Sequence, residues 1–251
     1  MKQAFWKSDW FVGLTISLVF LLMWFGHNAV LGGFERDAYD LGVRMSSADP
    51  GDKIAIIAID DRSIQNIGRW PWSRETHAQM IDKLSAAGAK TIGNTIFYSE
   101  AQVDAGLTWI RRLKGLLANV PLSGPEAELI PGTLLEAEHE LNTDGILAES
   151  LKNGGNAILA MQFVPGEPIG NPDEPLPDYV TRFAIPEDNI TDPSGDNFQP
   201  IQTIEAFQPI PALGEQAQGI GHLISLLDVD GGVRTEPLVI SYYDHMFPAQ
   251  S

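Results

Sequence analysis

The sequence has no cysteine and few cations: its 251 residues include 16 Lys and Arg against 33 Asp and Glu, for a formal net charge of -17. Without cysteine, disulfides, thiolate nucleophiles and Cys-based zinc or iron–sulfur sites are excluded. The shortage of cations argues against a nucleic-acid partner, because phosphate binding needs clustered Lys and Arg.

Motifs for catalysis are also missing. The chain contains no Gly-rich phosphate loop, no HExxH or GxSxG motif, and no kinase HRD or DFG element. We therefore predict no catalytic residues and no cofactor, and we expect this chain not to be an enzyme.

Metal-binding patterns are weak. Asp228, Asp230 and Gly231 resemble part of a calcium loop, but the fuller pattern of spaced acids ending in Glu is missing, which favours a plain turn. The histidines lie far apart in sequence without metal-type spacing, so we interpret them as structural or solvent-facing: His27, His77, His139, His222 and His245. We predict no metal site.

A long apolar run lies near the N-terminus. Trp10 to Phe34 contains no Asp, Glu, Lys or Arg, and as a helix it would extend roughly 37 Å, enough to cross a hydrocarbon core of about 30 Å. We predict a transmembrane helix over residues 10–33. Lys2 and Lys7 precede it, which places residues 1–9 in the cytoplasm and residues 34–251 outside. A cleaved signal peptide and a buried core helix are the alternatives, although no Ala-x-Ala cleavage site follows.

A second helix is predicted immediately after this run. Phe34, Ala38, Leu41 and Met45 follow helical spacing. This helix either packs on its own domain or forms a signalling stalk or dimer contact. The turn-forming residues Asp49 to Asp52 end it.

An α/β pattern follows. Lys53 to Asp60 is an apolar, β-branched run that predicts a strand covered on both faces. Ser73 is a suitable cap and Gly88 a suitable end for a helix over 74–87, and residues 90–97 predict a second strand. Strand, helix and strand in this order predict a right-handed parallel crossover.

The remaining elements complete the predicted fold. Helices are predicted over 105–119, 133–142 and 144–152, a strand over 156–163, a proline-rich excursion over 165–186, and an antiparallel hairpin of strands 221–227 and 233–243. The fold class is α/β, with a mixed, mostly parallel sheet flanked by helices and a C-terminal antiparallel hairpin after one transmembrane helix. We expect the domain of residues 34–251 to be truncated at its C-terminal end, because Ser251 does not follow a tail typical of a natural terminus.

Candidate ligand-binding residues cluster near the first predicted strand. They are Asp60, Asp61, Ser63, Arg69, Trp70, Trp72, Arg74 and Asn94. The carboxylate pair would lie at a strand end, where α/β sheets bind ligands, with the Trp residues as an aromatic wall and the Arg residues as a clamp for an anion. Core packing by the two Trp residues and a structural role for the acids are the plainer alternatives, and an acid–base pair in a hydrolase is a third.

A resemblance to a known family rests on the residues from Ile54 to Phe97, which read IAIIAIDDRSIQNIGRWPWSRETHAQMIDKLSAAGAKTIGNTIF. This block closely resembles the signature of the second class of CHASE domains, the cyclase- and histidine-kinase-associated sensory extracellular modules. The segment from Asp228 to Arg234 resembles the later Asp-x-Asp-Gly hairpin of that family. Asn94 stands where the family usually has Asp, which weakens the case for an acid-dependent site there.

The resemblance implies a function. The chain would be the periplasmic sensor of a receptor in the bacterial inner membrane, homodimeric, binding an unidentified small molecule or protein and controlling a cytoplasmic cyclase or kinase that this chain does not contain. Two alternatives are a structural dimerisation module without a small-molecule ligand and a membrane-tethered periplasmic enzyme.

Overall fold

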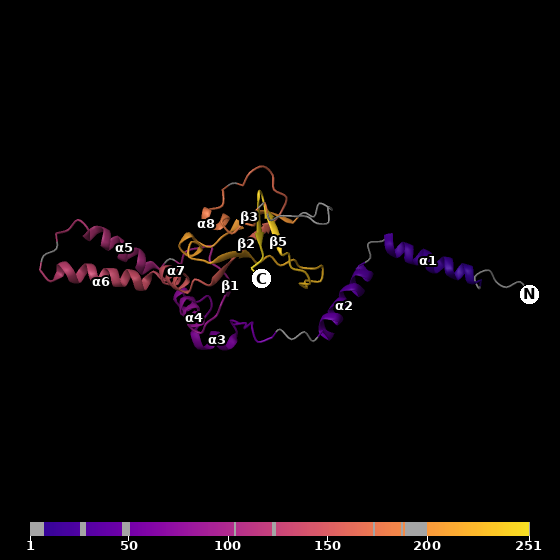
Figure 1. Ribbon diagram of the computed structural model, residues 1–251, viewed down its shortest axis with the longest axis horizontal. Coiled ribbons are helices and arrows are strands. Elements are labelled where there is room, and N and C mark those ends of the chain that lie inside the picture. The colour runs from indigo at the N-terminus through magenta and orange to yellow at the C-terminus, as the bar shows by residue number, and fades with distance from the viewer. Residues whose placement is uncertain are drawn as a thin grey trace, which may run out of the picture. The chain divides into compact units, whose positions relative to one another are not determined.

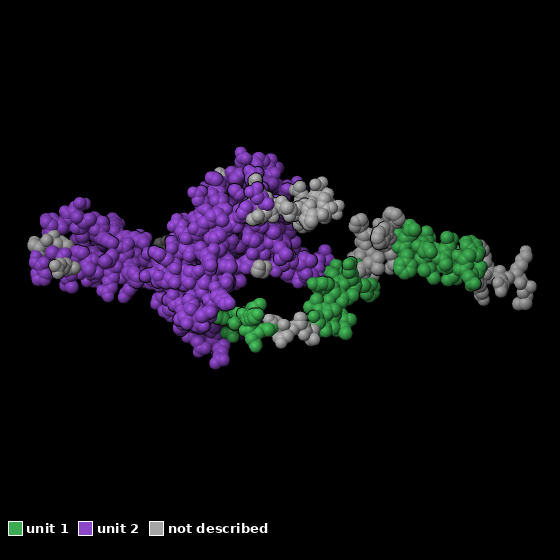
Figure 2. Space-filling view, in the orientation of Figure 1, with its two compact units in different colours: residues 1–60 green, residues 61–251 purple. Residues whose placement is uncertain are grey.

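The computed structural model describes residues 8–25, 29–46, 51–102, 104–121, 124–172, 174–186, 188 and 200–250. The chain divides into two compact units, Met1–Asp60 and Asp61–Ser251, coloured separately in Figure 2. The predicted cytoplasmic segment before Ser8, the turn residues Asp49 and Pro50, His27 and the terminal Ser251 lie outside the described residues.

The first unit contains two helices, α1 (Asp9–Phe25) and α2 (Ala29–Met45). The helix predicted from Phe34 to Met45 is therefore confirmed as the later part of α2. The transmembrane helix predicted over residues 10–33 is not found: among the helices that the structure describes, none is both long enough and apolar enough to cross a membrane.

The strand predicted for Lys53–Asp60 is wrong. Residues 53–60 form no strand, and all of them are exposed, including Ile54 at 72% and Ile56 at 89%. Apolar, β-branched residues favour an extended and buried environment. A strand must also pair with another strand, and the composition of one segment does not identify that strand. The predicted strand–helix–strand crossover is consequently not formed in the described structure.

The second unit is built around a six-stranded sheet with β2 (Ala157–Pro165) at its centre. The first part of β2 pairs in parallel with β1 (Ile92–Phe97) and with β4 (Gly219–His222), and its last residues pair antiparallel with β3 (Ile201–Phe207). Both predicted strands at 90–97 and 156–163 are confirmed, because apolar residues bounded by turn signals mark strands well when a partner is present.

The far end of the sheet corrects two predictions. β3 pairs in parallel with β5 (Val239–Tyr242), which forms an antiparallel hairpin with β6 (His245–Pro248). The hairpin therefore turns at Tyr243 and Asp244, not at 228–232, and no strand occupies 223–238. The sheet is mixed rather than mostly parallel.

The segment predicted to be the hairpin turn has its own internal bonds. Asp228 N–H donates to the Gly232 carbonyl, and the Arg234 guanidinium contacts the carboxylates of Asp228 and Asp230 at 2.9 and 2.8 Å. A loop that is stabilised by its own backbone hydrogen bond and ion pairs does not require a strand at each end. The turn residues were therefore not sufficient to locate the hairpin.

Helices cover the sheet and define the core (Figure 1). α4 (Arg74–Ala86) packs against α7 (Thr143–Gly154), which also contacts the short helix α9 (Pro211–Gly214). Their apolar faces meet the sheet in one core that includes Ile81, Leu147, Leu151, Leu159, Met161, Leu213, Ile240 and Phe247. Two further short helices are α3 (Asp61–Ile67) and α8 (Asp178–Thr181).

Two helices form a hairpin, α5 (Ala105–Leu117) and α6 (Glu126–Leu141). Figure 1 shows them side by side, extending away from the sheet. α6 begins earlier than the predicted residue 133 and continues through Pro131. The predicted helix begins too late because an internal proline, here Pro131, normally interrupts a helix.

Candidate functional site

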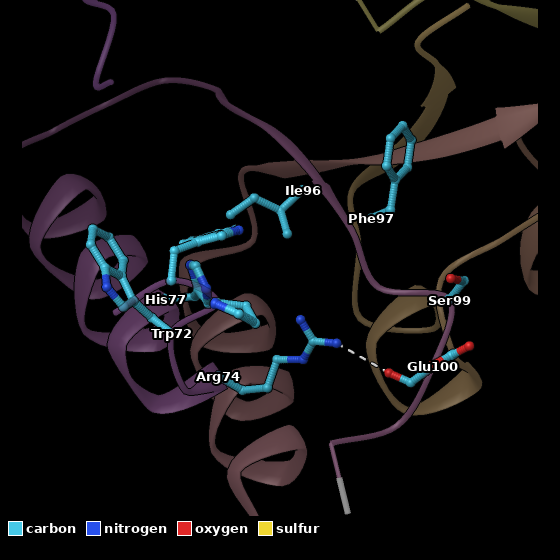
Figure 3. A pocket seen from close by; sticks show the side chains of 9 residues that line it. Trp72, Arg74, His77, Ile96, Phe97, Ser99 and Glu100 are labelled. Atoms are coloured by element: carbon cyan, nitrogen blue, oxygen red, sulfur yellow. Dashed lines mark hydrogen bonds between the residues drawn. The ribbon is translucent and has the colours of Figure 1, made fainter. Parts of the chain in front are cut away.

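A hollow of about 250 Å³ lies beside the N-terminus of α4 and the chain that follows β1 (Figure 3). In Figure 3, Trp72 and His77 lie together on one side, and Ser99 and Glu100 lie on the other. The lining residues are Trp70, Pro71, Trp72, Arg74, His77, Ile96, Phe97, Ser99 and Glu100.

Three aromatic rings form one wall of the hollow. The Trp70 ring lies edge-on to those of Trp72 and His77, at centroid distances of 5.4 and 5.7 Å. The indole N–H of Trp72 donates to the Gly68 carbonyl at 2.8 Å, which fixes that ring against the chain preceding α4. Ring pairs in this geometry attract each other beyond simple burial, so the wall is preformed.

Arg74, the first residue of α4, supplies the positive charge of the site. Its Nε lies 3.3 Å from Asp144 Oδ1, its Nη2 donates to the Glu100 carbonyl at 3.1 Å, and its guanidinium lies 4.3 Å from the centroid of the Tyr98 ring. The side chain is only 14% exposed. These contacts on three sides hold the guanidinium in one orientation at the wall.

Asp144 completes a polar network beneath Arg74. Its second carboxylate oxygen accepts from Gln102 N–H at 2.8 Å, while the Gln102 side-chain oxygen accepts from Arg74 N–H and from the Thr143 hydroxyl. The network joins the N-terminal ends of α4 and α7 to the chain after β1. A change at the hollow is thereby connected to two helices that cover the sheet.

Buried polar rings lie next to Arg74. Burial raises the pKa of Tyr98 to about 12, and its hydroxyl accepts from Asn94 Nδ2 at 2.8 Å. Burial, followed by the charge of Arg74, lowers the pKa of His77. Both effects favour the neutral form of the ring, so at neutral pH the two rings beside the Arg74–Asp144 ion pair are uncharged.

The comparisons with known proteins are informative at the family level. The family model of the CHASE2 domain matches residues 14–251. The chain belongs to the CHASE2 family. CHASE2 domains are sensory modules of the extracellular type, which confirms the resemblance seen in the sequence. Comparison with curated proteins and comparison with solved structures gave no match.

The CHASE2 structure brings together some of the predicted ligand-binding residues. Trp70, Trp72 and Arg74 line the hollow, and Asn94 is connected to it through Tyr98. Their assignment as ligand-binding residues stays a prediction.

The other predicted residues lie elsewhere. Asp61 is exposed at the start of α3, Ser63 lies two residues further in the same turn, and Arg69 is exposed before α4. None of these three lines the hollow. Asp60 belongs to the first unit, and its predicted place at a strand end is not seen because no strand forms there.

Three important residues of the CHASE2 site were not predicted. His77 was interpreted only as a structural or solvent-facing histidine, and Gln102 and Asp144 were not singled out at all. Asp144 lies 70 positions after its partner Arg74. The one available signal was an acid in the first turn of a predicted helix, a position that usually indicates only a favourable helix dipole.

A second hollow of about 440 Å³ has a different character. It lies between β3, the β5–β6 turn and the proline-rich segment, and it is lined by Glu174 and Glu205 together with Phe207, Tyr242 and Tyr243. Its lining, as far as the structure describes the chain, includes no Lys, Arg or His. Among the described residues, no group of three or more His, Asp or Glu side chains is arranged to hold a metal ion.

Proposed function

We propose that this CHASE2 domain is the extracytoplasmic sensor of a bacterial membrane receptor. Its output module, a cyclase or a kinase, would lie outside residues 1–251. The observation that carries the proposal is the match to a sensory family over nearly the whole chain. The aromatic and cationic hollow at α4 supports it, because apolar walls with one oriented charge are typical of sites for small molecules.

The site suggests how binding would be transmitted. A ligand that contacts Trp70 and Arg74 would favour one arrangement of the network through Asp144, and so one packing of α4 on α7. A ligand shifts a conformational equilibrium only by its difference in affinity for the two arrangements. Arg74 is the residue best placed to make that difference, since it contacts both the hollow and the network.

Ligand binding is tested with the full chain in detergent and pools of small metabolites, by thermal shift. We expect at least one pool to raise the unfolding midpoint, since a ligand that binds only the folded state stabilises it. Trp70→Ala should abolish the shift, and Leu238→Ala, which shortens an exposed apolar side chain away from the hollow and from the α5–α6 hairpin, should leave it intact. A shift that persists in Trp70→Ala would show that the ligand binds outside this hollow. The absence of any shift would count against a small-molecule sensor.

We also propose that residues 10–33 anchor the domain in the inner membrane with residues 1–9 in the cytoplasm. The proposal rests on the charge-free sequence from Trp10 to Phe34 and on the Lys residues before it. Alkaline phosphatase, whose disulfides form only outside the cytoplasm, is fused after Ser251. We expect an active, membrane-associated fusion; an inactive fusion would contradict the proposed topology.

A further inference from the structure

Among the described residues, no other element covers a large part of the surface of the α5–α6 hairpin. The two helices pack on each other, and α6 contacts α7 at the base. Figures 1 and 2 show the pair projecting from the second unit, away from the sheet. Such a hairpin has little access to the core that stabilises the other helices.

One face of each helix is used inside the hairpin. Leu107 is buried at its base, and Glu138 of α6 accepts from Arg111 Nε at 3.2 Å and from Lys114 Nζ at 2.6 Å on α5. These hydrogen bonds, that of Lys114 first, lower the pKa of Glu138. The contacts fix the rotation of α5 about its own axis and decide which residues face outward.

An apolar stripe lies on the face of α5 that these contacts leave open. Trp109, Leu113 and Leu116 are spaced four and three residues apart and are 60%, 46% and 64% exposed. Residues at that spacing share one helix face, and this stripe extends for about 10 Å. Val120, 49% exposed, follows in the turn after α5. A contiguous exposed apolar patch of this kind usually marks a surface that binds another macromolecule.

The charges of the two helices are opposite. α5 carries Arg111, Arg112 and Lys114 with no acid, whereas α6 carries five Glu with no Lys or Arg. Within the hairpin, Glu138 pairs with two of the three cations. A hairpin with one basic and one acidic helix can be complementary to a copy of itself, because a two-fold axis can bring the basic helix of each copy against the acidic helix of the other.

We propose that the α5 stripe binds the hairpin of a second copy of this chain, so that two hairpins form a four-helix bundle. The stripe of each copy packs against α6 of the other, and Arg112 faces the Glu residues of that helix. An anionic lipid surface is a poorer partner, since Glu138 already holds two of the three cations of α5, and α6 carries Glu without Lys or Arg, which headgroups of the same negative sign repel. The interface is independent of ligand binding in the hollow.

The first test measures the mass of the full chain by analytical ultracentrifugation in density-matched detergent. We expect a dimer, and we expect Leu116→Glu or Leu113→Glu to raise its dissociation constant by about tenfold or more, equivalent to roughly 1.4 kcal/mol. Leu238→Glu is the matched control, since Leu238 is 70% exposed and lies outside the hairpin. Circular dichroism checks that each variant keeps its helix content.

The second test uses charge. Added salt should weaken the proposed dimer, because it screens basic α5 from acidic α6. Arg112→Glu and Glu136→Arg should each weaken it, and the two together should restore part of the affinity. If α5 packed on α5 of the copy instead, the two basic helices would repel each other, so salt would strengthen the dimer and Glu136→Arg on α6 would leave it unchanged.

Three results would overturn the proposal. They are a monomeric parent chain, a dimer unaffected by the stripe variants, and a dimer strengthened by salt. Loss of binding to anionic phospholipid vesicles in Leu116→Glu, with a monomeric parent, would assign the stripe to a lipid surface.

Discussion

At the scale of single residues, the ion pair between Arg74 and Asp144 is the feature on which the site most depends. Both side chains are mostly buried, at 14% and 11% exposure, and each has further hydrogen bonds. Removing one charge of such a pair leaves the other poorly solvated, which usually destabilises a protein more than the intact pair stabilises it.

Asp144→Asn should therefore lower the free energy of unfolding by about 2–4 kcal/mol. Urea unfolding followed by Trp fluorescence measures the change. Asp82→Asn removes a carboxylate from the exposed part of α4 and should change stability by no more than about 0.5 kcal/mol. Equal effects of the two substitutions would mean that the pair is not structurally important.

The buried histidines predict a dependence of stability on pH. Burial lowers the pKa of His77 and of His222 below the ordinary 6.5; Arg74 adds to the effect at His77, while Glu236 opposes it at His222. Below pH 6.5 the unfolded chain then binds more protons than the folded chain, so stability falls as the pH decreases. Above pH 6.5 this contribution is complete.

We expect the urea midpoint to decrease between pH 7 and pH 5, and His77→Gln to reduce that decrease. His139→Gln, which changes a 68%-exposed histidine, should leave it unaltered. An identical pH dependence in the parent chain and His77→Gln would contradict the role given to His77.

Residues close together in the sequence were the predictable part of the site. Trp70, Trp72 and Arg74 lie within five positions, so their proximity follows from covalent connection. Gln102 and Asp144 reach Arg74 only because α4 packs on α7. That packing is a property of the folded chain and has no local signal in either segment.

At the scale of elements, the start of α4 shows how a local signal sets a boundary. The Ser73 hydroxyl accepts from Glu75 N–H, and Gly88 adopts a positive φ of 85° just beyond the end of the helix. Such caps satisfy backbone groups that the helix itself leaves unpaired. α4 could therefore be predicted to within a residue from the sequence.

Ser73→Ala should lower the free energy of unfolding by about 1 kcal/mol, because it removes the cap acceptor. Ser73→Asp supplies another acceptor and should retain most of the stability. Thermal and urea unfolding of the three proteins test this. The cap would be unimportant if Ala and Asp had the same effect.

Elements that depend on a distant partner were predicted less well. The apolar run before Asp60 has the composition of a strand but does not pair as one. The C-terminal hairpin turns at residues 243–244, and not at the Asp- and Gly-rich loop of residues 228–232. Of the predicted strand 221–227 only the first two residues belong to a strand, at the end of β4, and of the predicted strand 233–243 only β5 forms. Each pairs with a segment far away in the chain, β4 with β2 and β5 with β3.

At the scale of the whole molecule, the excess of acids opposes folding. The formal net charge is -17, so the carboxylates repel one another in the compact folded state. The few ion pairs of the described residues reduce this repulsion only locally. Salt screens exposed charges over about 10 Å at 0.1 M. Stability and self-association should therefore respond to salt in opposite directions.

The thermal midpoint of the full chain should rise between 0.02 M and 0.3 M NaCl, because screening relieves repulsion among the carboxylates. Differential scanning calorimetry measures it at a concentration where the chain is monomeric, so that dissociation does not contribute. Replacing the exposed acids Glu75, Asp82 and Asp178 by their amides should reduce the increase. A midpoint that falls with salt would show that attractive charge pairs outweigh the net repulsion, and the acidic surface would then stabilise the fold.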